Sequence, residues 1–358
     1  MSTKISSKSV AVDEPSALLD FWPRFLMFPL LAFLIYPFWV GGWFGQSLGA
    51  DIATVVVLSY SWFCVGGAFH EASHQTLFKN EGPNVWFGRL MGAMIFIPYT
   101  VYKESHRNHH AYLNTSRDYE LWPYSNPECS LWFRRAYVWI DLVFAVATAP
   151  YIYGRIYLYR DPRLRPKVVQ AITMEYLGIA LFWAAVIGSG IYYGYSQGWT
   201  WQDVNPLWVA PLAIAATCNT MRKFVEHLGM TSRDPMQGTR TIAPTNWWNR
   251  MLNYFNFDIA VHGPHHRYPR AHHYELLSKF NEAREKNPET QYPQFKSYYS
   301  AIMHTLPCLW NYPATGVHEE ETQGKAEQAE TNLQWEAKHD LENGTVSIPE
   351  ASSADPAA

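Results

Sequence analysis

The stretch that decides the fold reads IATVVVLSYSWFCVGGAFHEASH over residues 52–74. It begins with an uncharged apolar run, Ile52 to Phe69, which is long enough for a helix to cross the hydrocarbon core of a bilayer. It ends with His70 and His74, which share one face of a helix because they lie four positions apart. The stretch therefore predicts a membrane helix that carries two metal-binding side chains at its end.

Three other segments also indicate membrane-spanning helices. Residues 25–47 precede the span at residues 52–69 and are joined to it by a short loop without Lys or Arg. Residues 176–198 and 204–221 form a second pair whose loop also lacks basic residues. Since cytoplasmic loops carry an excess of Lys and Arg, we expect both hairpin loops outside and both termini in the cytoplasm.

The apolar segment from Ala136 to Gly154 has positive charge on both sides. Arg134 and Arg135 precede it, and the densest basic loop of the chain, residues 155–167, follows it. Such a helix is expected to lie on the cytoplasmic leaflet or dip into it. The sequence thus predicts an all-α integral membrane fold, with four transmembrane helices in two hairpins, interfacial helices and a cytoplasmic histidine-rich cap.

The composition agrees with this class. Charged residues make up 16% of the chain, against about 25% in an average soluble domain. The net charge of −3 offers no basic face for nucleic acid. Residues 1–22 are polar and residues 311–358 are acidic and poor in apolar side chains, so we expect a disordered leader and a disordered tail around a membrane domain at 23–310.

Histidines occur in short groups that follow helical spacing. His106, His109 and His110 form one His-x-x-His-His motif, and residues 262–266 form a second one. Positions i, i+3 and i+4 share a helix face, so each motif is expected to point three imidazoles at one spot. Pro264 is compatible with a helix if it lies in the first turn. His227 stands alone between the motifs.

Several metal sites remain open on spacing alone. Nine clustered imidazoles are enough for two metals, and imidazole suits iron, copper, zinc and nickel. His70-Glu71-x-x-His74 is also the zinc-protease pattern with Glu71 as general base, a reading that leaves seven histidines unexplained. A haem protein or a metal transporter would need polar ligands inside the spans, which contain none. His272 and His273 are expected at the surface or supporting a ligand.

The order and spacing of these motifs resemble the membrane fatty acid desaturase and hydroxylase superfamily over roughly residues 25–280. Asn114 and Asp118 follow the second motif as they do in that family, and Tyr274-Glu275-Leu276 follows the third. The segment ending in Glu226-His227 is similar to the family segment that supplies an extra histidine ligand.

The resemblance implies a mushroom-like fold with a cytoplasmic cap that holds two iron ions and uses O2 as co-substrate. Glu71 and Asp118 are expected to orient imidazoles through their carboxylates. The implied iron ligands are His70, His74, His106, His109, His110, His227, His262, His265 and His266.

The implied activity is oxidation of an unactivated C–H bond in a lipid acyl chain, with fatty acid desaturation first. Hydroxylation of an alkyl, acyl or carotenoid chain stays open, because residues 226–230 lean towards the membrane alkane hydroxylase branch. No nucleotide-binding, ferredoxin-like or cytochrome b5 motif occurs in the chain, so electrons are expected from a separate ferredoxin, rubredoxin or cytochrome b5 type of donor.

Overall fold

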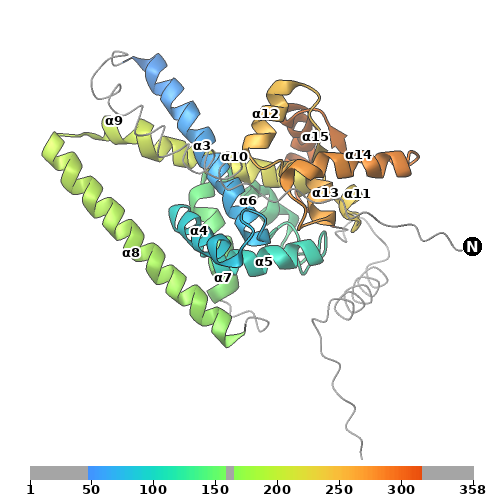
Figure 1. The fold of residues 1–358 in the computed structure, drawn as a ribbon, viewed down its shortest axis with the longest axis horizontal. Coiled ribbons are helices and arrows are strands. Elements are labelled where there is room, and N and C mark those ends of the chain that lie inside the picture. Colours follow the sequence, from blue (N-terminus) through green and yellow to red (C-terminus); the bar gives the residue numbers. More distant parts are fainter. Residues whose placement is uncertain (1–46, 159–164, 317–358) are drawn as a thin grey trace, which may run out of the picture.

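The computed structural model describes residues 47–158 and 165–316, and it is almost entirely helical (Figure 1). The expected helix at 25–47, the leader and most of the tail lie outside the described residues. The apolar helices extend to one side of the molecule, and the C-terminal elements gather on the other. In chain order the first helices are α3 (Leu48–His74), α4 (Glu81–Met94), α5 (Tyr99–Ala111), α6 (Leu131–Val143), α7 (Ala145–Leu158) and α8 (Pro166–Gln197).

The later part of the chain is made of shorter elements. Its only strands among the described residues are two short parallel ones that pair Thr241 with Gln294. The elements are α9 (Trp201–Val204), the π-helix η2 (Asn205–Val209), α10 (Ala210–His227), α11 (Pro235–Gly238), β1 (Thr241–Ile242), α12 (Trp247–Phe255), α13 (His262–Arg267), η3 (His273–Glu275), α14 (Leu276–Lys286), β2 (Gln294–Phe295) and α15 (Tyr298–Asn311).

Helix α3 is the central element, and it packs against both α10 and α4. Its start is capped by the Ser47 hydroxyl, which accepts a hydrogen bond from the Ala50 N–H. A side chain on Gly66 would come within 3.0 Å of the Asn219 amide on α10. The glycine therefore lets α3 and α10 approach closely, which brings their histidine-bearing ends together.

Helices α3 and α8 are each long and apolar enough to cross a membrane. Only 6% of the most apolar stretch of α8 is buried inside the protein, so its apolar side chains face outwards. Exposed apolar surface of this extent is stable in lipid rather than in water. The fold is thus that of an all-α membrane protein. Helix α8 begins ten residues before the expected span, with Pro166 in its first turn.

The segments predicted at 204–221 and 136–154 are interrupted in the structure. The first is divided among α9, η2 and α10, with Pro206 at the start of the π-helix, and within the described residues it does not qualify as a span by itself. The second bends by 119° between α6 and α7, as a broken span or a re-entrant loop would. Among the described residues, two helices therefore qualify as spans, or three if the bent pair is one.

Helix α5, which carries the second histidine motif, is held in place by its neighbours. The Tyr99 hydroxyl donates a hydrogen bond to the Ala72 carbonyl of α3 over 2.8 Å. The Glu175 carboxylate of α8 accepts from the Thr100 N–H, which compensates for the missing side-chain cap at Pro98. The start of α5 is thereby fixed to both α3 and α8.

Helix α13, which carries the third motif, begins where β1 meets it. The Gly263 N–H donates to the Thr241 hydroxyl over 2.9 Å. We expected Pro264 to be compatible with a helix only in the first turn, and it lies in the first turn of α13. The chain beyond α15 continues to pack, because the Ala314 carbonyl accepts from the Gly229 N–H.

We predict that Gly88→Ala lowers stability by about 1–3 kcal/mol, because a Cβ there would lie 2.4 Å from the Tyr99 ring that anchors α5. Gly82→Ala in the same helix is the matched control, because no atom lies within 4 Å of its Cβ position. The measurement is the midpoint of heat-induced loss of the monodisperse protein in detergent. Equal midpoints for the two variants would contradict the proposed packing.

Candidate metal centre

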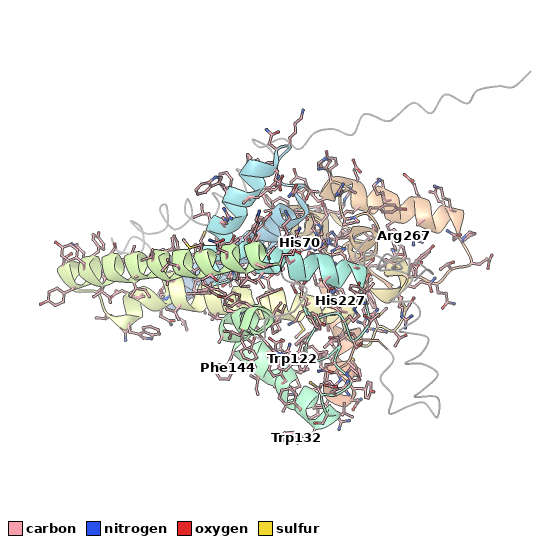
Figure 2. The ribbon with its side chains drawn as sticks, turned by 90° about the horizontal axis from the view of Figure 1, so that it is seen from below. His70, Trp122, Trp132, Phe144, His227 and Arg267 are labelled. Atoms are coloured by element: carbon pink, nitrogen blue, oxygen red, sulfur yellow. The ribbon has the colours of Figure 1, made fainter. Side chains whose placement is uncertain are left out.

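Nine histidines converge in the interior of the protein, in two adjacent groups. Within each group, one ring nitrogen of every histidine lies within 4.8 Å of the others. Figure 2 places His70 and His227, one from each group, in the middle of the molecule and Trp132 at its edge. The first group is His70, His74, His106, His110 and His265, and the second is His109, His227, His262 and His266.

The two His-x-x-His-His motifs do not each point at a single spot, as we expected from spacing. His106 and His110 belong to the first group, whereas His109 belongs to the second. At about 100° per residue, positions four apart differ by only about 40° around the helix, while the intermediate position points well away. The third motif divides in the opposite sense, since His265 joins the first group. Each of these two helices therefore serves both groups.

The distances between ring nitrogens fit metal coordination. The Nε2 atom of His106 lies 3.0 Å from that of His74 and 3.1 Å from that of His110. In the second group, His262 Nε2 lies 2.8 Å from His227 Nε2. Nitrogens bound to one metal at about 2.1 Å are about 3.0–3.4 Å apart. The residues present therefore fit two metal ions, one in each group.

Hydrogen bonds to the other ring nitrogens fix which atom faces the centre. His106 Nδ1 lies 2.9 Å from Glu120 Oε2, and His109 Nδ1 lies 2.7 Å from Asp118 Oδ2. A ring that donates from Nδ1 keeps the lone pair of Nε2 free for a metal. His262 uses the Ile259 carbonyl in the same way.

Both carboxylates that we expected to orient imidazoles lie against a histidine. Asp118 contacts His109, and Glu71 Oε1 lies 3.2 Å from His70 Nδ1. Glu120 was not anticipated, although it contacts His106 and accepts a hydrogen bond from Tyr153. The signal for it was a second carboxylate two positions after Asp118, in the same loop.

Burial and charge set the protonation of these groups. Burial lowers the pKa values of His262, His265 and His266 well below the usual range, so these imidazoles are neutral. Burial alone would raise the pKa of Glu120, but the His106 imidazole brings it down to about 2. Burial lowers the pKa of His109, and the charge of Asp118 reverses this and raises it to about 9.

The other histidines among the described residues lie outside the two groups. His273 is buried and contacts Asp258 through Nδ1 at 2.8 Å, while the His304 ring lies near Phe295. His272 stacks on the Tyr274 ring. His318 and His339 fall outside the described residues.

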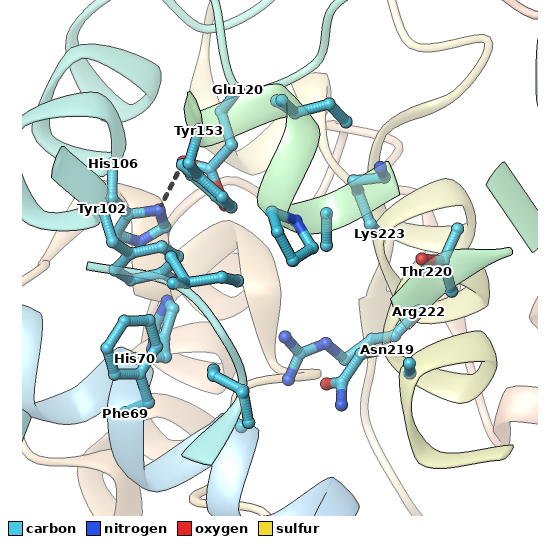
Figure 3. Close-up of a pocket in the computed structure, with 18 of the residues that line it drawn as sticks. Phe69, His70, Tyr102, His106, Glu120, Tyr153, Asn219, Thr220, Arg222 and Lys223 are labelled. Atoms are coloured by element: carbon cyan, nitrogen blue, oxygen red, sulfur yellow. Dashed lines mark hydrogen bonds and ion pairs between the residues drawn. The ribbon is translucent and has the colours of Figure 1, made fainter. Parts of the chain in front are cut away.

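A cavity reaches the centre from the side of the apolar helices. Five of the nine histidines line it, and Figure 3 shows two of them, His70 and His106, in close-up; the five are His70, His106, His109, His227 and His262. Most of its wall is apolar or aromatic and comes from α3, α7 and α10 and from the loop before α5: Trp62, Phe69, Ile97, Ala149, Ile152, Leu212 and Ala215. The cavity is thus suited to an apolar chain that ends or bends at the histidines.

Comparison with known proteins agrees with the motif order. The sequence profile of the fatty acid desaturase family matches residues 49–298. The sn-1 acyl-lipid omega-3 desaturase (ferredoxin) of Synechocystis sp. is 23% identical over 61% of this chain and 62% of its own length. The chloroplastic omega-3 fatty acid desaturase of Glycine max is 23% identical over 64% of this chain and 51% of its own length.

The chain thus aligns with less than two thirds of either relative. The family match, by contrast, covers well over half of the chain and includes all nine converging histidines. On that match, this chain belongs to the fatty acid desaturase family.

Proposed function

We propose that the protein is an oxidoreductase that oxidises an unactivated C–H bond in a lipid acyl chain, with desaturation as the reaction. The observation that supports it is the pair of adjacent histidine groups beside a largely apolar cavity, which five of the nine histidines line. Two bound iron ions, with O2 as co-substrate, would supply the oxidising power. In desaturation, two hydrogens leave the substrate, and with two electrons and two protons from a donor they reduce O2 to two waters.

The residues of the chain would bind the iron ions, orient the imidazoles that hold them and enclose the substrate. The nine histidines would be the iron ligands, five for one ion and four for the other. Asp118, Glu120 and Glu71 would hold their imidazoles in the metal-binding orientation. The apolar cavity wall would place a methylene group beside the histidines and exclude water from it.

Four spanning helices in two hairpins remain our proposal for the topology, with the centre and both termini on the cytoplasmic side. Support comes from α3 and α10, whose C-terminal ends carry His70, His74 and His227 towards one centre. On that side a soluble donor has access. One relative is named for ferredoxin, and a ferredoxin, rubredoxin or cytochrome b5 type of protein would serve.

Hydroxylation by the same centre is the second candidate. It rests on Glu226, whose Oε2 lies 3.7 Å from the metal-facing nitrogen of His262. A carboxylate at this position distinguishes the second group from the first and belongs to the segment that leans towards hydroxylases. The zinc-protease alternative is not favoured, because His70 and His74 lie in a group with three further histidines.

Lipid mass spectrometry of a host that expresses the chain with a plant-type ferredoxin and its reductase tests the reaction. We expect an acyl species lighter by two hydrogens, absent with His109→Ala because the second group then loses a ligand. His272→Ala is the control, since His272 lies outside both groups, and it should retain the product. A species heavier by one oxygen would select hydroxylation, and unchanged lipids would contradict an acyl-lipid substrate.

We predict that Glu120→Gln weakens iron retention about 10–100-fold, because it removes the charge that orients His106. Iron remaining on the purified protein after dialysis against a chelator is the measurement. Glu104→Gln is the control, because Glu104 pairs with the exposed Arg107 on the same helix α5. Wild-type retention in the Glu120 variant would show that this carboxylate does not support the site.

A further inference from the structure

One wall of the cavity beside the metal centre is polar and charged. Asn219, Arg222 and Glu226 lie at positions i, i+3 and i+7 of α10 and therefore share a face of that helix. All three line the cavity. Figure 3 shows Arg222 and Asn219 extending into it from α10, across from His70 and Tyr102. A purely apolar chain would make no hydrogen bonds to these side chains.

Several polar atoms of this wall are buried without a hydrogen-bond partner among the described residues. They are Arg222 Nε and Nη1, Asn219 Oδ1 and Glu226 Oε1. Among the described residues, the carboxyl group beside Arg222 is that of Glu226, whose Oε2 lies 3.8 Å from Nε, which is too long for a hydrogen bond. A buried guanidinium is costly unless it is paired and hydrogen-bonded. Among these atoms, Arg222 Nε and Nη1 are the donors, so Arg222 can donate hydrogen bonds to a bound molecule.

The distance from this wall to the metal centre is short. Arg222 Nε lies 3.8 Å from Glu226 Oε2, and that atom lies 3.7 Å from His262 Nε2. Glu226 is only 2% exposed, and the Arg222 side chain is 13% exposed. A group that accepts hydrogen bonds from Arg222 would thus be held close to His262 Nε2, the nitrogen that faces the second metal site.

We propose that Arg222 binds an oxygen-bearing group of the substrate. The substrate would then be a chain whose carboxylate, carbonyl or hydroxyl lies close to the carbon that is oxidised. The apolar part of the cavity would take the rest of the chain. This inference rests on the proposed function for the role of the two histidine groups. Both relatives are named for the omega-3 position. At 23% identity, those names do not determine which carbon this protein oxidises.

Equilibrium binding to the purified, iron-loaded protein in nanodiscs tests the proposal without turnover. The probes are radiolabelled laurate, methyl laurate, dodecanol and dodecane, which share a chain and differ in oxygen chemistry. Empty nanodiscs give the background. We expect at least one oxygenated probe to bind about tenfold or more tightly than dodecane, as a hydrogen bond to a charged group allows. The probe that binds best identifies the oxygen group.

Arg222→Met removes the charge while keeping a long side chain. It should weaken binding of the preferred oxygenated probe about tenfold or more and change dodecane binding less than about twofold. Arg222→Lys keeps the charge but loses the fork of donors, so an intermediate loss is expected. Iron content and elution as a single species are measured for both variants, and Arg222→Lys decides the question if Arg222→Met loses iron.

Unchanged affinity for the oxygenated probes in both variants would overturn the proposal, and so would an equal loss for dodecane. Either result would mean that Arg222 does not bind an oxygen-bearing group of the substrate. The outcome is separate from that of the lipid assay. A preserved preference for an oxygenated probe, together with unchanged lipids in the host, would contradict the proposed acyl-lipid reaction and leave the binding site standing.

Discussion

The whole structure depends on the meeting of nine imidazoles in the protein interior. Within each group their ring nitrogens must come as close together as two ligands of one metal ion. They come from α3, α5, α10 and α13, which are separated by long stretches of chain. Burial keeps the imidazoles of α13 neutral, so their nitrogens repel one another little before a metal binds. The cost of bringing polar rings into the interior is offset only if the rings find partners there.

Those partners are supplied on the outer side of the rings. Carboxylates contact His70, His106 and His109, and a backbone carbonyl contacts His262. Each contact directs one nitrogen outward and therefore the other nitrogen inward. Tyr153 on α7 in turn donates to Glu120, so a helix that carries none of the nine histidines still helps to orient one of them. The centre is thus supported by helices that contribute no ligand to it.

The apolar helices position the centre and also define what reaches it. Gly66 of α3 allows α10 to approach closely, and histidines help to line the cavity between α3, α7 and α10. Helix α10 bears Arg222 and Glu226 on one face, and His227 follows Glu226 at the end of the same helix. The same helix therefore supplies one of the nine converging histidines and the charged cavity wall next to it.

Much of this was determined by the sequence alone. Uncharged runs predicted α3 and α8, and dense histidine spacing predicted that the second and third motifs are helical, because periodicity along the chain depends only on local geometry. The nine converging histidines were likewise identified from their motifs and from the family resemblance.

The tertiary structure decided the rest. It divided each His-x-x-His-His motif between two groups, because a helix turns the middle imidazole of the motif away from the first and the last. It brought Glu120 to His106 and placed Arg222 in the cavity. It also interrupted the segment at 204–221 with a π-helix. These features arise from how distant elements pack, and a pattern within one segment carries no information about which residue of another segment it will meet.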